Sequence, residues 1–94
     1  MIRHVVILDL AKNAPKELIK DKILELKNII SEIINIEVGV DINFDPSPSD
    51  LCIIADFKNI KDLEIYANHP KHLEVIKEYI KPYLITRKVT DFYV

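Results

Sequence analysis

The pattern of hydrophobic and polar positions predicts four β-strands. Residues 2–10 (IRHVVILDL) and 51–57 (LCIIADF) carry apolar side chains at both odd and even positions, so both faces of these strands are apolar. Residues 36–43 (IEVGVDIN) alternate strictly between apolar and polar positions, which is typical of a strand with one buried face. Residues 84–94 are rich in β-branched residues and also contain polar positions. We therefore expect two strands buried on both faces and two less buried strands.

Apolar residues recur at helical spacing between the predicted strands. Over residues 18–34 they form a single stripe among lysines and glutamates, which predicts one amphipathic helix of about five turns. Residues 12–15 (KNAP) precede it and supply a capping residue type and a proline suited to a first helical turn. Residues 59–82 predict two shorter helices, because Pro70 forces the residue before it out of the helical region.

The predicted elements follow the order β-α-β-β-α-β, with the two short helices acting as one crossover. This order is the ferredoxin-like arrangement, an α+β fold with a four-stranded antiparallel sheet. Right-handed crossovers place the first and third strands at the centre of the sheet, and these are the two strands that are apolar on both faces. Residues 1–94 are too few for a second domain, so we expect a single domain.

This topology leaves one face of the sheet without cover from its own helices. Either Val5, Ile7, Cys52 and Ile54 or the alternating set must point to that face, because side chains alternate along a strand. Burial of one aliphatic side chain stabilises a protein by roughly 1.5–3 kcal/mol, and an exposed apolar face promotes aggregation. A second copy is the simplest cover, since twofold dimers are the commonest oligomers. We expect a homodimer whose two sheets form an α+β barrel.

The composition excludes several classes of function. The chain has 13 Lys and Arg residues against 15 Asp and Glu, a net charge of −2 that argues against nucleic acid and against an anionic membrane as partners. Gly39 is the only glycine, so no phosphate-binding loop exists and no nucleotide cofactor is expected. Cys52 is the only cysteine and cannot form an intrachain disulfide. Without a signal peptide or an apolar run of about 20 residues, the sequence predicts a cytoplasmic protein.

Residues 66–75 (YANHPKHLEV) hold two of the three histidines and leave three interpretations open. The spacing of His69 and His72 suits metal ligands, but Pro70 breaks the helix between them and no third ligand is evident, so we expect no metal. A His72 kept neutral by the helix dipole can accept a proton, while Tyr66 donates a hydrogen bond to an oxyanion. Alternatively, His69 hydrogen-bonds the backbone around the helix break and His72 is a half-exposed residue of the first turn. Tyr66 is then an amphipathic residue at the rim and His4 a hydrogen-bonded core residue.

Several blocks together resemble the stress-response A/B barrel domain, a family of dimeric α+β barrels. They are MIRHVVILDL, VGVDI, ADF, YANHPKHLEV, KPYL and RKVTDFYV, in this order along the chain. The Tyr-x-x-His-Pro-x-His block and the Arg-His pair near the N-terminus are the specific part, and the resemblance covers nearly the whole chain. Members often have Gly or Pro between the first helix and the second strand, where this chain reads SEIIN. That departure concerns a turn.

The resemblance implies a homodimer with a cavity in each subunit between sheet and helices. It implies less about activity, because most members have none defined, although one is a polyketide cyclase. The catalytic tyrosine and histidine of that cyclase fall on Tyr66 and His72, which become the candidate catalytic residues, and we expect His4 and His69 to contact a ligand. Two functions remain open: a module that binds a small apolar ligand, and a cofactor-free cyclase or lyase.

Overall fold

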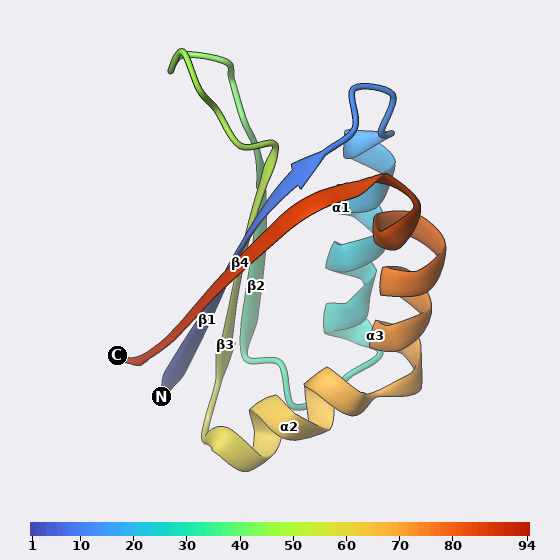
Figure 1. Cartoon of the computed structure of the whole chain (residues 1–94). Coiled ribbons are helices and arrows are strands. Elements are labelled where there is room, and N and C mark those ends of the chain that lie inside the picture. The colour runs from blue at the N-terminus through green and yellow to red at the C-terminus, as the bar shows by residue number, and fades with distance from the viewer.

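The computed structural model describes residues 1–94 and places all helices on one face of a four-stranded antiparallel sheet (Figure 1). The strands are β1, Ile2–Leu10; β2, Asn35–Val40; β3, Leu51–Phe57; and β4, Leu84–Tyr93. The α-helices are α1, Lys16–Glu25; α2, Ile60–Asn68; and α3, Pro70–Val75. The strand order is β2-β3-β1-β4, so β1 and β3 lie in the centre and the predicted ferredoxin-like α+β fold is confirmed.

The alternation of side chains along β1 divides the molecule into a covered and an uncovered face. His4, Val6 and Leu8 point toward the helices and are buried. Val5 and Ile7, one position out of phase, lie on the other face, and Ile7 keeps 40 % of its surface exposed. The central strands have the bounds that their continuous apolar patterns predict.

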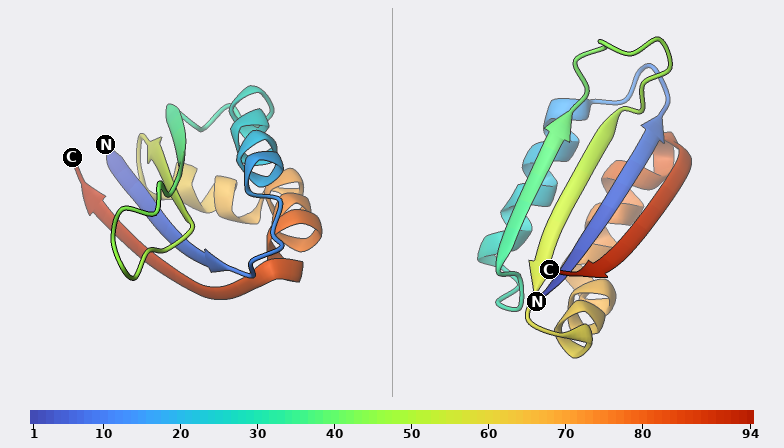
Figure 2. Two further views of the ribbon diagram at one scale, coloured as in Figure 1. Left: turned by 90° about the horizontal axis from the view of Figure 1, so that it is seen from above. Right: turned by 90° about the vertical axis from the view of Figure 1, so that its left-hand side faces the viewer.

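The core lies between the sheet and the helices. Phe57 at the end of β3 and Ile19 on α1 are completely buried there. No helix lies over the opposite face of the sheet, which the right-hand view of Figure 2 shows directly. Cys52 and Ile54 of β3 pair with Ile7 and Val5 of β1 and are only partly buried on that side. The outward set is therefore Val5, Ile7, Cys52 and Ile54.

The first helix is shorter than the sequence predicts. The α-helix ends at Glu25, a 3₁₀ turn follows over Leu26–Asn28, and the chain then leaves the helical path. Ile30 remains buried, but the backbone N–H of Ile34 donates to the carbonyl of Asp56 at 2.9 Å instead of continuing the helix. The apolar residues in 26–34 are therefore spaced as in a helix because they are buried in a turn that leads back to the sheet. The expectation of a helix of five turns is wrong.

The strand β2 also ends earlier than predicted, at Val40 instead of Asn43. Asn43 adopts φ = 60°, a left-handed conformation that Asn tolerates better than most residues. Its backbone N–H donates to a carboxylate oxygen of Asp41 at 2.6 Å, which closes a local turn. This turn directs the strictly alternating sequence out of the sheet and into the loop before β3.

The break at Pro70 lies where the sequence predicts it. Asn59 caps α2 by accepting a hydrogen bond from the backbone N–H of Asp62 at 2.9 Å. His69 is extended, with ψ = 133°, and Pro70 begins α3. The chain then continues without a further break through a π-helical turn over Ile76–Ile80 and a 3₁₀ turn over Lys81–Tyr83 into β4. None of the helices combines the length and the apolar character required to traverse a bilayer.

Candidate functional site

A cavity of about 60 Å³ lies between the sheet and the segment that follows Pro70. Seven of its ten lining residues are hydrophobic, and they come from β1, β3, β4 and the helices. The three remaining residues are His4 on β1, His72 on α3 and Arg87 on β4. An apolar hollow with few polar groups at fixed positions is the usual form of a small-molecule site, but such sites typically measure about 300–1,000 Å³, so this cavity admits only a very small molecule.

Tyr66 and His72 lie against each other in this cavity. Their ring centroids are 4.1 Å apart with an interplanar angle of 38°. Tyr66 comes from the last part of α2 and His72 from the first turn of α3, so the break at Pro70 brings the two rings together. Tyr66 also packs against Phe57, with ring centroids 5.0 Å apart, which anchors it in the core.

The backbone fixes the proton of His72. Its Nδ1 lies 3.1 Å from the carbonyl oxygen of Ala67, and since a carbonyl only accepts, Nδ1 carries the hydrogen and donates it. In the neutral ring, Nε2 then keeps its lone pair. Desolvation by burial lowers the pKa of His72; the bond to Ala67 opposes this change, and the charges of His4, Arg87 and His69 lower the pKa further. His72 is therefore a neutral imidazole at pH 7 with an available basic nitrogen.

Burial shifts the pKa of Tyr66 in the opposite direction to that of His72 and raises it to about 12. The positive charge of Arg87 acts against this rise. The phenol therefore keeps its proton at any ordinary pH. It can donate a hydrogen bond to an oxygen atom of a bound molecule.

His4 contributes a second imidazole to the cavity from the centre of the sheet. Its Nδ1 lies 2.5 Å from a carboxylate oxygen of Asp91, the residue opposite it on β4. The rings of His4 and Tyr66 meet edge to face, with centroids 6.2 Å apart. Asp91 thus fixes the orientation of His4, and the sequence alone gives no sign of this pair because 87 positions separate the two residues.

His69 has a different position from the other two histidines. Its Nδ1 accepts a hydrogen bond from the backbone N–H of Lys71 at 3.1 Å and thereby caps α3. It does not line the cavity. Of the four residues singled out in the sequence, the fold brings Tyr66, His72 and His4 together and leaves His69 at the helix start. No three His, Cys, Asp or Glu side chains come together as a group that could hold a metal ion.

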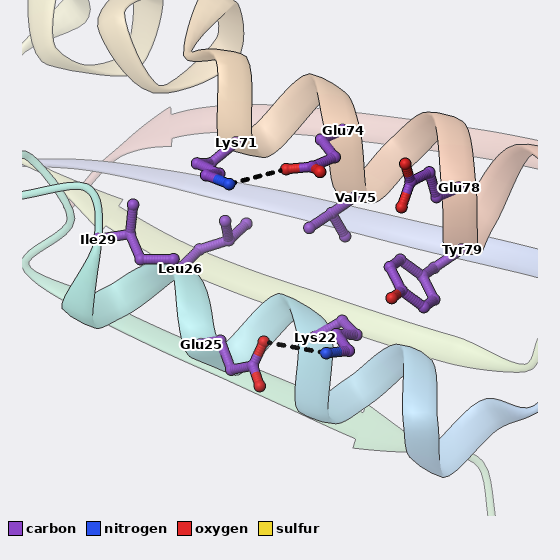
Figure 3. Close-up of a pocket in the computed structure, with 9 residues that line it drawn as sticks. All are labelled: Lys22, Glu25, Leu26, Ile29, Lys71, Glu74, Val75, Glu78 and Tyr79. Carbon is purple, nitrogen blue, oxygen red and sulfur yellow. Dashed lines mark hydrogen bonds and ion pairs between the residues drawn. The ribbon is translucent and has the colours of Figure 1, made fainter.

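A second hollow, of about 220 Å³, lies between α1 and α3 on the helical side of the molecule (Figure 3). Its charged side chains compensate one another: Lys22 pairs with Glu25 at 3.6 Å, and Lys71 pairs with Glu74 at 3.1 Å. The Nζ of Lys22 also lies 5.5 Å from the ring centre of Tyr79. No histidine lies in this groove. Although this groove is larger, it has fewer unpaired groups that could transfer a proton or bind a ligand than the cavity around Tyr66.

Comparison with known proteins agrees with the sequence-based resemblance. The family model described as Stress Responsive A/B Barrel Domain matches residues 2–94. No curated protein matches the chain.

Several solved structures share the fold. A dimeric protein of unknown function with a ferredoxin-like fold from Bacteroides fragilis is 26 % identical, with a TM-score of 0.83 over 99 % of this chain and 95 % of that one. A dimeric ferredoxin-like protein from Thermobifida fusca is 24 % identical, with a TM-score of 0.87 over 99 % and 90 %. A hydroxynitrile lyase from Passiflora edulis is 21 % identical, with a TM-score of 0.83 over 99 % and 92 %.

The lowered pKa of His72 predicts that acid destabilises the protein through this residue. Below about pH 6.5 the unfolded chain takes up a proton on His72, whereas the folded chain resists it, so the free energy of unfolding falls as the pH drops through this interval. The His72→Gln variant cannot take up the proton. We expect its free energy of unfolding, measured with urea at about pH 7.5 and pH 5.5, to fall less than that of the wild type.

His69→Gln is the control for this comparison, because it removes another histidine from the same block and keeps His72 in the cavity. Its free energy of unfolding should fall with pH nearly as steeply as that of the wild type, because the charge of His69 is the smallest of the causes that lower the pKa of His72. An equal fall for the wild type and His72→Gln would contradict the assignment of a partly buried, neutral His72.

Proposed function

Because the chain belongs to the stress-responsive A/B barrel family, we propose that it forms a homodimer in which each subunit binds a small ligand between its sheet and helices. The observation that carries the proposal is the largely apolar cavity around Tyr66 and His72. A cytoplasmic location is part of the same proposal and is in keeping with a lone free thiol at Cys52.

The uncovered face of the sheet supports the homodimer. Val5, Ile7 and Ile54 form an apolar centre on this face. At one end, the guanidinium of Arg3 binds both carboxylate oxygens of Asp56, at 2.9 and 3.2 Å, so the charges there are already paired. A second sheet can pack on such a face without leaving these charges uncompensated. The Bacteroides and Thermobifida proteins of the same fold are themselves described as dimeric.

Replacement of Ile54 by aspartate is expected to break the dimer. The substitution places a carboxylate in the centre of the proposed interface, where it would lose its hydration without gaining a partner. Leu73→Asp is the matched control, because Leu73 lies on α3 with 49 % of its surface exposed. Sedimentation analysis should show dimers for the wild type and Leu73→Asp and monomers for Ile54→Asp. A wild type that sediments as a stable monomer would refute the dimer.

The volume of the cavity limits the ligand. About 10–15 Å³ of such space holds one water molecule, so a cavity of about 60 Å³ holds on the order of four to six non-hydrogen atoms. The apolar lining favours a ligand with a short hydrocarbon part. A polyketide chain does not fit this space.

Filling the cavity should abolish ligand binding. Leu84 lies on the cavity wall and is partly exposed, so Leu84→Phe can extend into the hollow with little strain on the core. Ile85→Phe is the control, since Ile85 is the next residue and is 66 % exposed. In an NMR titration with butanone, resonances of Tyr66 and His72 should shift in the wild type and in Ile85→Phe. They should stay in place in Leu84→Phe, and unchanged resonances in all three proteins would contradict the ligand site.

A second candidate function is proton transfer without a cofactor, favoured by the contact between His72 and Tyr66. The Nε2 atom of His72 would take a proton from a carbon atom next to a carbonyl, and the Tyr66 hydroxyl would donate a hydrogen bond to the resulting enolate oxygen. Cyclases and lyases that need one base and one oxyanion donor use such a pair. The small cavity points to a small carbonyl compound as substrate.

Exchange of the α-protons of butanone for deuterium tests this candidate function. We expect the wild type to accelerate the exchange, His72→Ala to lose this acceleration by about a hundredfold or more, and Tyr66→Phe to lose a smaller part. His69→Asn is the control, because His69 lies outside the cavity and Asn can also accept the capping hydrogen bond at the start of α3. A rate in His72→Ala equal to that of the wild type would exclude His72 as the base and leave the binding function intact.

A further inference from the structure

One lining residue of the cavity plays no part in the function proposed above, and it carries a permanent charge. Arg87 lies on β4 opposite Leu8, a buried residue on the helix-facing side of β1. It lines the cavity and is itself exposed, so it forms part of the cavity's rim. A guanidinium at the rim of an otherwise apolar hollow selects for negative charge.

The guanidinium of Arg87 has no carboxylate partner within the chain. The ion pairs of the structure join Arg3 to Asp56, Lys16 to Asp50, Lys22 to Glu25 and Lys71 to Glu74, and His4 is hydrogen-bonded to Asp91. Asp91 lies on the same face of β4 as Arg87, but its carboxylate is hydrogen-bonded to His4. The charge of Arg87 nevertheless reaches the interior of the cavity, because it lowers the pKa of both Tyr66 and His72.

We propose that the ligand is a short organic monocarboxylate whose carboxylate pairs with Arg87 while its hydrocarbon part lies against the apolar cavity lining. This inference rests on the proposed ligand-binding function and names its ligand class. The planar guanidinium presents two parallel N–H groups that match the two oxygens of a carboxylate. Donors on Tyr66 and acceptors on His72 remain for a carbonyl or hydroxyl group of the same molecule.

The cavity favours an organic acid over an inorganic anion such as phosphate. Seven hydrophobic residues line it, and phosphate would lose its hydration against them without gaining donors beyond Arg87 and Tyr66. A carboxylate group with two or three further carbon atoms has about five or six non-hydrogen atoms, so it fits the volume and leaves only one end charged.

The experiment compares butyrate with butyramide, a neutral molecule of nearly the same shape, by NMR titration of the protein. The wild type should bind butyrate at least about tenfold more tightly, the difference expected for one charge-assisted hydrogen-bonded pair. Arg87→Gln should lose this preference and bind both molecules alike. Lys88→Gln, which removes the same charge at the next residue on the opposite face of β4, should keep it.

The possible outcomes distinguish the carboxylate proposal from the underlying proposal of a ligand site. If the wild type binds both molecules equally, or if Arg87→Gln keeps the preference for butyrate, the carboxylate proposal is overturned and the ligand site stands. If neither molecule binds to any of the proteins, the ligand site itself fails. Phosphate bound as tightly as butyrate overturns the choice of an organic acid. Weakened self-association of Arg87→Gln with unchanged butyrate binding assigns Arg87 to the dimer contact and also overturns the proposal.

Discussion

The structure depends on one constraint: neighbouring side chains of a strand point to opposite faces, and both faces of the two central strands are apolar. Helices cover the face that carries His4, Val6 and Leu8, whereas Val5 and Ile7 remain uncovered. Strand β1 therefore contributes one face to the cavity wall and the other face to the surface that we propose as the dimer interface. Because β1 is common to both, a packing change on one face is transmitted directly to the other.

The second feature that positions the site is the helix break at Pro70. Pro70 cannot continue α2, so the chain turns there, and the His69 side chain satisfies a backbone N–H of the new helix. This turn places His72 of α3 over Tyr66 of α2. The residues of this block thus have different positions: His69 supports the break in the helix, while His72 and Tyr66 line the cavity.

The sequence predicts most of the fold but only part of the site. The central strands could be predicted to the residue because their apolar runs end at polar or turn residues, whereas the first helix could not, since a buried turn at Ile30 has the same apolar spacing as a helix. Tyr66 and His72 could be found because they belong to one short block. Asp91 and Arg87 could not, because their positions follow from the register of β4 against β1, which brings together residues almost a chain length apart.

The charged residues around the cavity connect the proposed ligand site at Arg87 with the protonation of His72. Desolvation is the main cause of the lowered pKa of His72, and the nearby Arg87, His4 and His69 act in the same direction. An anion bound to Arg87 would offset the guanidinium charge and so raise the pKa of His72 toward its ordinary value. By linkage, protonation of His72 would then strengthen anion binding by the same factor. Under the two proposals above, a carboxylate ligand and a basic His72 would be coupled, because the carboxylate would raise the pKa of the imidazole that burial and the nearby positive charges lower.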